Sequence, residues 1–271
     1  MASPTRIPVN CARLVLPIGV SVTALALFAS GQSSQSPIQA PSSTLSQPVL
    51  VELFTSEGCS DCPPADALLA QLDASQFVPG AQAIVLSEHV TYWNHLGWRD
   101  PFSLDAMTVR QQQYEAHFGL TSSYTPQMVV DGAEQFVGND SSKLSIAVAH
   151  AAATQKPKIA IEDAHWGDGS VSFSVRGDAL ASATLVAVLA QNATRSEVAH
   201  GENAGRTLHH VAVVRVIKEF GSKAADGRPL RLAGAISSRS DKTDGPLRLV
   251  VFLTDRKTGH VIAVAEQILS P

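Results

Sequence analysis

Short apolar runs alternate with polar turns through the first half of the chain and predict alternating strands and helices. The run at 49–54 is continuous and rich in strand-forming residues, which indicates a strand buried on both faces. A turn at 55–58 follows, and behind it prolines suit a first helical turn while apolar residues recur at helical spacing. These residues are Pro63, Pro64, Ala67, Leu68, Leu69 and Leu72. The pattern predicts a strand, a turn and a helix in direct succession.

The alternation of strands and helices continues beyond this helix. Gly119 suits a helix C-cap, Asp131-Gly132 is a strong hairpin signal, and Asp140 or Ser141 suits the N-cap of a last helix. The predicted elements are a strand at 83–86, a helix from about 104 to 118, strands at 127–130 and 135–137, and a helix to about 154. The predicted order is therefore βαβαββα.

Beyond Pro157 the pattern changes to short apolar runs broken by Gly, Asp and Asn. Alternation and turn signals at this spacing predict a small antiparallel β domain. The predicted strands lie at 159–161, 171–175, 185–189, 211–217, 247–253 and 261–265. We therefore expect an α/β fold in which a βαβαββα domain at 48–156 is followed by a β-rich domain at 157–271.

The N-terminal segment has a different composition. Arg6 and Arg13 precede an apolar run at 14–28 that ends in small residues, which predicts a signal peptide at 1–31 that is removed on export. The run is shorter than the ~20 apolar residues of a spanning helix, which disfavours a retained anchor. Residues 32–47 are rich in Ser, Gln and Pro and predict a disordered linker. We expect a periplasmic or secreted protein with no stable membrane insertion after cleavage.

Charge and cysteine content narrow the function classes. The net charge is −4 and no basic stripe is present, which argues against a nucleic-acid partner. Of the three cysteines, Cys11 lies in the predicted signal peptide, which leaves Cys59 and Cys62 for the exported chain. A disulfide between them closes so short a loop that it removes little unfolded-chain entropy. Redox chemistry or metal binding is a better reason to keep the pair.

The Cys59-Ser60-Asp61-Cys62 motif falls between the first predicted strand and helix. Amide groups and the helix dipole at this place stabilise a thiolate, so Cys59 is the expected attacking sulfur. Cys62 lies one turn later and can resolve a mixed disulfide. The same pair could ligate zinc, but structural zinc sites usually need two further ligands, and no second CxxC or HxxxH is present.

A second mark is the Thr125-Pro126 bond at the start of the predicted hairpin. The combination of CxxC and this proline resembles thioredoxin-like folds, in which such a proline is cis and lies against the CxxC. A cis bond here would present the backbone of the preceding residues to an incoming extended peptide. We therefore expect Tyr124, Thr125 and Pro126 to bind substrate; the alternative is an ordinary turn proline.

Acidic residues surround the cysteines in the sequence, and no Lys or Arg occurs from 14 to 98. They are Glu52, Glu57, Asp61, Asp66 and Glu88. Carboxylates oppose a thiolate, and a less stabilised thiolate makes a more reducing couple. We therefore expect a reductant or an exchange catalyst. Glu52 lies inside a buried run, and our hypothesis is that it accepts the proton of Cys62.

Two loops are candidates to border the cysteines. The loop at 88–98 follows a predicted parallel strand, where open α/β sheets place their ligand crevice, and His89 in it could transfer protons, bind substrate or ligate a metal. Packing is the favoured role for Trp93 and Trp98. The polar loop at 201–210 could reach the cysteines from the β-rich half, or only satisfy its own hydrogen bonds. His209 and His210 alternate faces on a strand and make a poor chelate.

Several of these motifs together resemble a family of secreted bacterial proteins of unassigned function, which have a thioredoxin-like domain and a β-rich C-terminal extension. The resemblance spans almost the whole exported chain. In that family acids commonly stand at the positions of Thr91 and Asn94, so this loop lacks those carboxylates. The matching segments are 51–66, 89–98, 100–102, 110–111, 124–127 and 201–208.

The sequence therefore predicts an exported thiol-disulfide oxidoreductase whose redox centre is the Cys59–Cys62 disulfide, with no metal or other cofactor. Its expected partners are a disulfide-bearing protein or small thiol and an upstream electron donor. The alternatives are a copper-binding or copper-delivery protein that uses Cys59, Cys62 and His89, because thiolates favour Cu(I), and a binding module without redox activity.

Overall fold

The computed structural model describes residues 46–167, 169–177, 183–221, 226–233 and 245–269. The predicted signal peptide at 1–31, and residues 32–45 of the predicted linker, lie outside the described residues. The first half consists of β1 (Gln47–Thr55), α1 (Pro63–Ser75), β2 (Ala81–His89), α2 (Asp105–Phe118), β3 (Gln127–Val130), β4 (Glu134–Val137) and α3 (Ser141–Ala152). The second half consists of β5 (Ile159–Gly167), β6 (Ser170–Gly177), β7 (Ala183–Glu197), β8 (Thr207–Phe220), β9 (Asp226–Ala233), β10 (Leu247–Asp255) and β11 (Val261–Leu269).

Every strand and helix predicted from the sequence is present, and β9 is the element that the prediction missed. Gly227 and Pro229 lie inside β9 and are typical of turns rather than strands. The strand forms nevertheless, because it stands at the edge of a sheet and pairs on one side only, with β6. An edge strand tolerates a proline because its outer backbone groups need no partner strand.

A large mixed sheet forms the centre of this α/β fold, with strand order β11-β10-β7-β8-β2-β1-β3-β4. Strand β1 runs parallel to β2 and antiparallel to β3. The sheet continues across the sequence boundary near Pro157, because β8 pairs with β2 in parallel at Ser87 and Val213. Four strands of the second half therefore extend the sheet of the first half.

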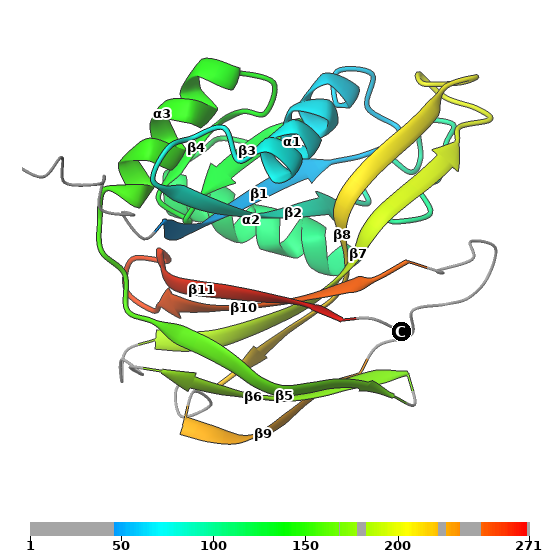
Figure 1. Cartoon of the computed structure of the whole chain (residues 1–271). Coiled ribbons are helices and arrows are strands. Elements are labelled where there is room, and N and C mark those ends of the chain that lie inside the picture. Colours follow the sequence, from blue (N-terminus) through cyan, green and yellow to red (C-terminus); the bar gives the residue numbers. More distant parts are fainter. Residues whose placement is uncertain (1–45, 168, 178–182, 222–225, 234–244, 270–271) are drawn as a thin grey trace, which may run out of the picture. The chain divides into compact units, whose positions relative to one another are not determined.

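The helices cover both faces of the first-half strands (Figure 1), with α1 and α3 on one face and α2 on the other. Leu53 of β1 packs toward Ala65 of α1, whereas its neighbour Glu52 contacts Arg110 of α2. Successive residues of a strand point to opposite faces, so these contacts fix which side chains lie under α1.

A small antiparallel sheet, in the order β5-β6-β9, packs against the second-half part of the large sheet. Its inward residues include Phe173 and Leu232, which share a core with Leu189 and Val251 of the large sheet. A separate core joins β1, β2 and the helices to the inner residues of β7, β8, β10 and β11. Strands of the second half thus complete the core of the first half.

Candidate functional site

The turn between β1 and α1 carries a disulfide that joins Cys59 to Cys62. Both residues are buried, and Cys59 is only 1% exposed. The turn is closed by hydrogen bonds to Ser56: its hydroxyl accepts from the Gly58 N–H at 3.1 Å, and its carbonyl accepts from the Cys59 N–H at 3.1 Å. Helix α1 begins at Pro63, so Cys62 is its N-cap residue. Cys59 lies in the turn before the helix and not at its first residue.

The loop at Thr125 lies next to this turn. The Thr125–Pro126 peptide bond is cis, as the sequence predicted. The Thr125 hydroxyl oxygen accepts a hydrogen bond from the Trp93 indole N–H at 2.8 Å. The Trp93 side chain packs on Gly58, where an added Cβ would lie 3.1 Å from the Trp93 Cβ. Trp93 therefore connects the loop to the residue before Cys59.

Tyr124 makes internal contacts in this loop. Its hydroxyl donates to Gln135 of β4, and its carbonyl accepts from the Gln111 side-chain amide at 2.7 Å. Burial raises the pKa of the Tyr124 hydroxyl above its usual value. The ring of Tyr124 is therefore fixed by β4, and the parts of the loop nearest the disulfide turn are Thr125 and Pro126.

His89 lies on the α1 face of the sheet at the end of β2, and it is buried. Its Nδ1 lies 2.7 Å from Asp100 Oδ2, so the ring donates to this carboxylate. Asp100 also accepts from the amides of Glu57 and Phe102, at 2.9 and 2.8 Å. Burial would raise the pKa of Asp100, but His89 and these hydrogen bonds lower it below its usual value. His89 thus faces into the protein, and its Nε2 has no hydrogen-bond partner in the described part.

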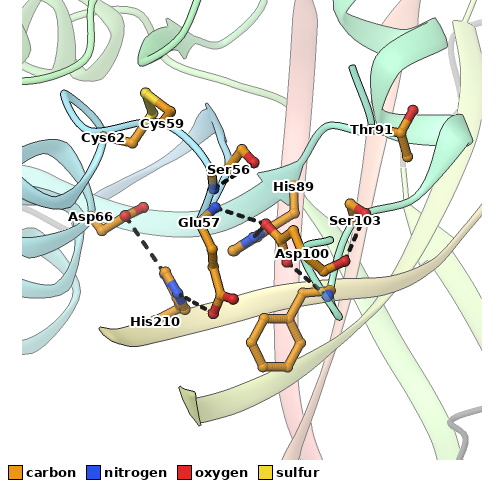
Figure 2. Close-up of polar contacts among 12 residues, drawn as sticks. Ser56, Glu57, Cys59, Cys62, Asp66, His89, Thr91, Asp100, Ser103 and His210 are labelled. Carbon is orange, nitrogen blue, oxygen red and sulfur yellow. Dashed lines mark hydrogen bonds and ion pairs between the residues drawn. A yellow bond between two sulfur atoms is a disulfide. The ribbon is translucent and has the colours of Figure 1, made fainter. Parts of the chain in front are cut away.

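His210 of β8 places a positive charge under the turn (Figure 2). Its Nε2 lies 3.3 Å from Glu57 Oε1, and its Nδ1 lies 3.7 Å from Asp66 Oδ2, which is an ion-pair distance and too long for a hydrogen bond. Burial would lower the pKa of His210, but Asp66 and then Glu57 raise it to about 10. The Trp98 indole N–H donates to the other Glu57 oxygen at 2.8 Å. The ring of His210 also contacts that of His89, with centroids 4.6 Å apart.

The charge at the site therefore differs from the sequence expectation. No Lys or Arg occurs from 14 to 98, yet β8 supplies a cation from the second half of the chain. His210 lies within ion-pair distance of both buried carboxylates, Glu57 and Asp66, so its charge offsets part of theirs and the negative field is not unopposed. The acidic residues alone therefore do not indicate a reducing couple.

The loop between β7 and β8 clamps the disulfide turn through Asn203. Its side-chain amide donates to the carbonyls of Glu57 and Cys59, both at 2.8 Å. Asn203 is completely buried, and its own oxygen accepts from Arg206 at 3.0 Å. The sequence analysis had left open whether the loop at 201–210 reaches the cysteines. The structure brings it directly onto them.

Glu202 extends this clamp at the surface. Its carboxylate accepts from the Ser60 N–H at 3.1 Å, and hydrogen bonding from Ser60 lowers the pKa of Glu202 below its usual value. Gly201, with φ +79°, lets the chain turn there, and an added Cβ would lie 3.1 Å from the Trp98 Cβ. The loops at 88–98 and 201–206 therefore pack against each other beside the cysteines.

The structure does not bring Glu52 to Cys62. One Glu52 oxygen accepts from Arg110 Nε at 2.6 Å, and the other accepts from the Tyr114 hydroxyl at 2.6 Å, both on α2. Cys62 lies beside α1 on the opposite face of the sheet. On the α2 face, burial and the nearby Glu52 raise the pKa of Glu88 well above its usual value. This buried group of polar side chains is separate from the disulfide.

The match with a known protein family covers both halves of this site. A family described as "Protein of unknown function (DUF1223)" matches residues 50–254. The chain belongs to this family. The matched segment of this DUF1223 chain includes both cysteines, the loop at Thr125 and the clamp at 201–206. No curated protein matches the chain.

A solved structure shares the DUF1223 chain's fold. It is a protein of Agrobacterium tumefaciens whose crystal structure was determined as a structural genomics target. It is 22% identical, with a TM-score of 0.61 over 83% of this chain and 95% of that one. A Bacteroides uniformis β-glucuronidase is also similar in part, with 13% identity and a TM-score of 0.17 over 42% of this chain and 13% of the enzyme. Only the first likeness is strong enough to show a common fold.

Sequence reasoning missed the roles of Asn203 and His210. Both belong to a polar segment that precedes and enters β8, and their partners Glu57 and Asp66 are far away in the DUF1223 sequence. The alternation of His209 and His210 was a usable signal, because one ring had to face inward, and the structure buries His210.

Among the described residues, no group of three or more His, Cys, Asp or Glu side chains is arranged to hold a metal ion. None of the described helices is long and apolar enough to cross a membrane.

Proposed function

We propose that this DUF1223 chain is an exported thiol-disulfide oxidoreductase that acts through the Cys59–Cys62 dithiol on protein or small-molecule disulfides. The observation that carries the proposal is the disulfide itself, closed between residues three apart in the turn between a central strand and a helix. Structural stability is a poor reason for such a short bridge, because it constrains the unfolded chain little.

The surroundings of the disulfide support a reactive rather than a structural bridge. Trp93 ties the turn to Thr125, and Asn203 ties it to the second half of the chain. Perturbed titratable groups gather at functional sites more often than elsewhere, and here the pKa of Asp100 is lowered and that of His210 is raised. Both belong to a group of buried ionisable side chains behind the disulfide. Its members are Glu57, Asp66, His89, Asp100 and His210.

We also infer that residues 48–156 form a thioredoxin-like domain. The strand order β2-β1-β3-β4, with β1 parallel to β2 and the β3–β4 hairpin antiparallel, supports this inference. The positions of the disulfide after β1 and of the cis bond before β3 also support it.

In the proposed reaction, the reduced protein attacks a substrate disulfide with the Cys59 thiolate. This step forms a mixed disulfide and releases one substrate sulfur as a thiolate. Cys62 then attacks Cys59 Sγ, which reforms the internal disulfide and releases the second substrate sulfur. The substrate gains two electrons, and an upstream dithiol donor returns the protein to its reduced form.

We propose that an extended substrate binds at the loop at Thr125. Trp93 links Thr125 to the disulfide turn, and the next residue, Pro126, has no backbone N–H to donate. His89 is buried and bonded to Asp100, so we propose that it supports the turn from below and does not bind substrate. A periplasmic or secreted location is part of this proposal.

The deciding experiment is an insulin reduction assay with the purified protein and a dithiol reductant, together with the Cys59–Cys62 reduction potential measured against a thiol buffer. We expect turnover by the wild type, none by Cys59→Ser, and a mixed disulfide trapped on Cys59 in Cys62→Ser. The double variant Cys59→Ser/Cys62→Ser is the matched control for turnover by the reductant alone.

Two outcomes contradict the proposal. One is a wild type that reduces insulin no faster than the double variant. The other is stoichiometric Cu(I) binding by the reduced protein that is lost in His89→Ala, with no disulfide exchange at any reductant concentration. The second result would favour the copper-binding alternative.

A further inference from the structure

A buried acceptor atom lies one helical turn after the second cysteine. Asp66 is four residues after Cys62, one helical turn away on the same side of α1, and its N–H donates to the Cys62 carbonyl at 3.1 Å. Asp66 is 5% exposed. Its Oδ1 has no hydrogen-bond partner within the described part of the chain, although buried polar atoms ordinarily have one. In Figure 2 this carboxylate lies between the disulfide and His210.

His210 balances the charge of this carboxylate. The imidazole Nδ1 lies 3.7 Å from Asp66 Oδ2, and the other oxygen of the same carboxylate is the unpartnered Oδ1. The pKa of His210 is raised to about 10, so the ring is protonated at neutral pH and its single positive charge is shared between Asp66 and Glu57. One Asp66 oxygen is thus paired with a cation, and the other has no donor.

The other acids near the cysteines are less suited to take a proton from Cys62. Asp61 is exposed to solvent. Both oxygens of Glu57 are engaged, by Trp98 and by His210. Glu52 is bonded to α2 on the opposite face of the sheet.

We propose that Asp66 is the proton acceptor for Cys62 during disulfide exchange, and that His210 is a positioning residue that holds the carboxylate; this inference rests on the proposed function. In the resolving step, the Cys62 S–H bond breaks and its proton moves to Asp66 Oδ1. The sulfur electron pair forms the Cys62–Cys59 bond, the bond from Cys59 to substrate breaks, and the substrate leaves as a thiolate. On reduction of the disulfide, Asp66 returns the proton to Cys62.

Other titratable groups lie around Asp66 and His210 on the elements packed against them, and they also affect how the rate of resolution depends on pH. They are Glu57 of the turn, His89 of β2, Asp100 of the following loop and the thiols themselves. Variants must therefore be compared as full pH profiles and not at one pH.

The test follows the reduced protein after it is mixed with oxidised glutathione and quenched with acid at successive times. Mass spectrometry separates the mixed disulfide from the internal disulfide. In the wild type the mixed disulfide should not accumulate. In Asp66→Asn it should accumulate on Cys59, with resolution near pH 7 slowed about 100-fold, the lower end of general-base contributions. Resolution should recover as pH rises toward the ordinary thiol pKa of about 8.5, because Cys62 then ionises without help.

Asp61→Asn is the matched control, since it removes the same charge from an exposed position between the cysteines. It should resolve as fast as the wild type. Asp66→Glu keeps a carboxylate but moves it by one methylene, so it should resolve the mixed disulfide faster than Asp66→Asn and more slowly than the wild type near neutral pH. If Asp66→Asn does not fold, Asp66→Glu decides: a resolving rate and pH profile identical to the wild type would overturn the assignment.

The outcomes separate the two proposals. A wild type that forms neither species with glutathione disulfide refutes the proposed function. A wild type that oxidises normally, together with a folded Asp66→Asn that resolves at the same rate over the whole pH range, leaves the function standing and refutes the role of Asp66. His210→Gln should shift the pH profile of resolution without abolishing it, and an unchanged profile would refute the positioning role.

Discussion

Replacing Asn203 by Ala removes the clamp between the β7–β8 loop and the disulfide turn. The side-chain amide donates to two carbonyls, those of Glu57 and Cys59, at 2.8 Å each, and Asn203 is completely buried. In the variant both carbonyls lose their side-chain donor. A buried polar group left without its partner costs about 1–3 kcal/mol. Because the Cys59 carbonyl keeps its hydrogen bond from the Cys62 N–H at 3.3 Å, we count this cost once, for the Glu57 carbonyl, and expect a total loss of about 1–3 kcal/mol.

The measurement is the free energy of unfolding from urea titration, with the disulfide kept oxidised in both proteins. Asn139→Ala is the control, because this residue is exposed in the turn before α3 and its loss should cost no more than about 0.5 kcal/mol. The alkylation rate of Cys59 in the reduced protein is a second readout, and it should rise in Asn203→Ala because the turn is less restrained.

A folded Asn203→Ala with the stability of Asn139→Ala would refute this reasoning. It would mean that the two carbonyls find other donors at no cost, and that the β7–β8 loop lies against the turn without stabilising it. An unchanged alkylation rate with a large loss of stability would refute only the link between the clamp and access to Cys59.

Further predictions concern the buried charges. The folded pKa of His210 is raised to about 10 from an ordinary value near 6.5. The contribution of protonated His210 to the free energy of unfolding is therefore complete below about pH 6.5 and is lost as pH rises toward 10. Urea titrations across this range should show the free energy of unfolding fall by a few kcal/mol, and His210→Gln should remove this fall. Arg110→Met leaves Glu52 buried without its cation and should cost about 3–5 kcal/mol in the same assay. Glu88→Gln should not lower stability near pH 5, because the pKa of Glu88 is raised well above its usual value and a neutral side chain already suits its place there. Glu202→Ala should leave the thermal midpoint unchanged, since its contact with the turn is exposed.

The strands and helices were predictable because their signals are local. Continuous apolar runs gave β1 and β2, the helical spacing after Pro63 gave α1, and Asp131-Gly132 gave the β3–β4 hairpin. Strand β9 was missed for an equally local reason, because Pro229 is typical of turns. The joining of both halves into one sheet depends on a single parallel pairing of β2 with β8, and no local pattern encodes that choice.

The candidate site was predictable only in part. The disulfide and the cis bond at Pro126 followed from short motifs. The roles of Asn203 and His210 did not, because their partners are more than a hundred residues away in the chain. Glu52 shows a different limit: its burial was foreseen, but the face of the sheet to which it points depends on the register and on where α2 packs.

The clamp at Asn203 also affects the order in which parts of the chain fold. It joins residues 146 positions apart. Contacts at such separation form late in folding, because the entropy cost of closing a long loop comes before the contact can stabilise the fold. A nascent chain that ends near residue 156 has both cysteines but lacks Asn203, His210 and Glu202. In that interval the thiols are open to any oxidant they meet, and the buried Glu57 and Asp66 lack their cation, His210. The two halves therefore cannot be separated or exchanged as independent modules without rebuilding the turn between β1 and α1.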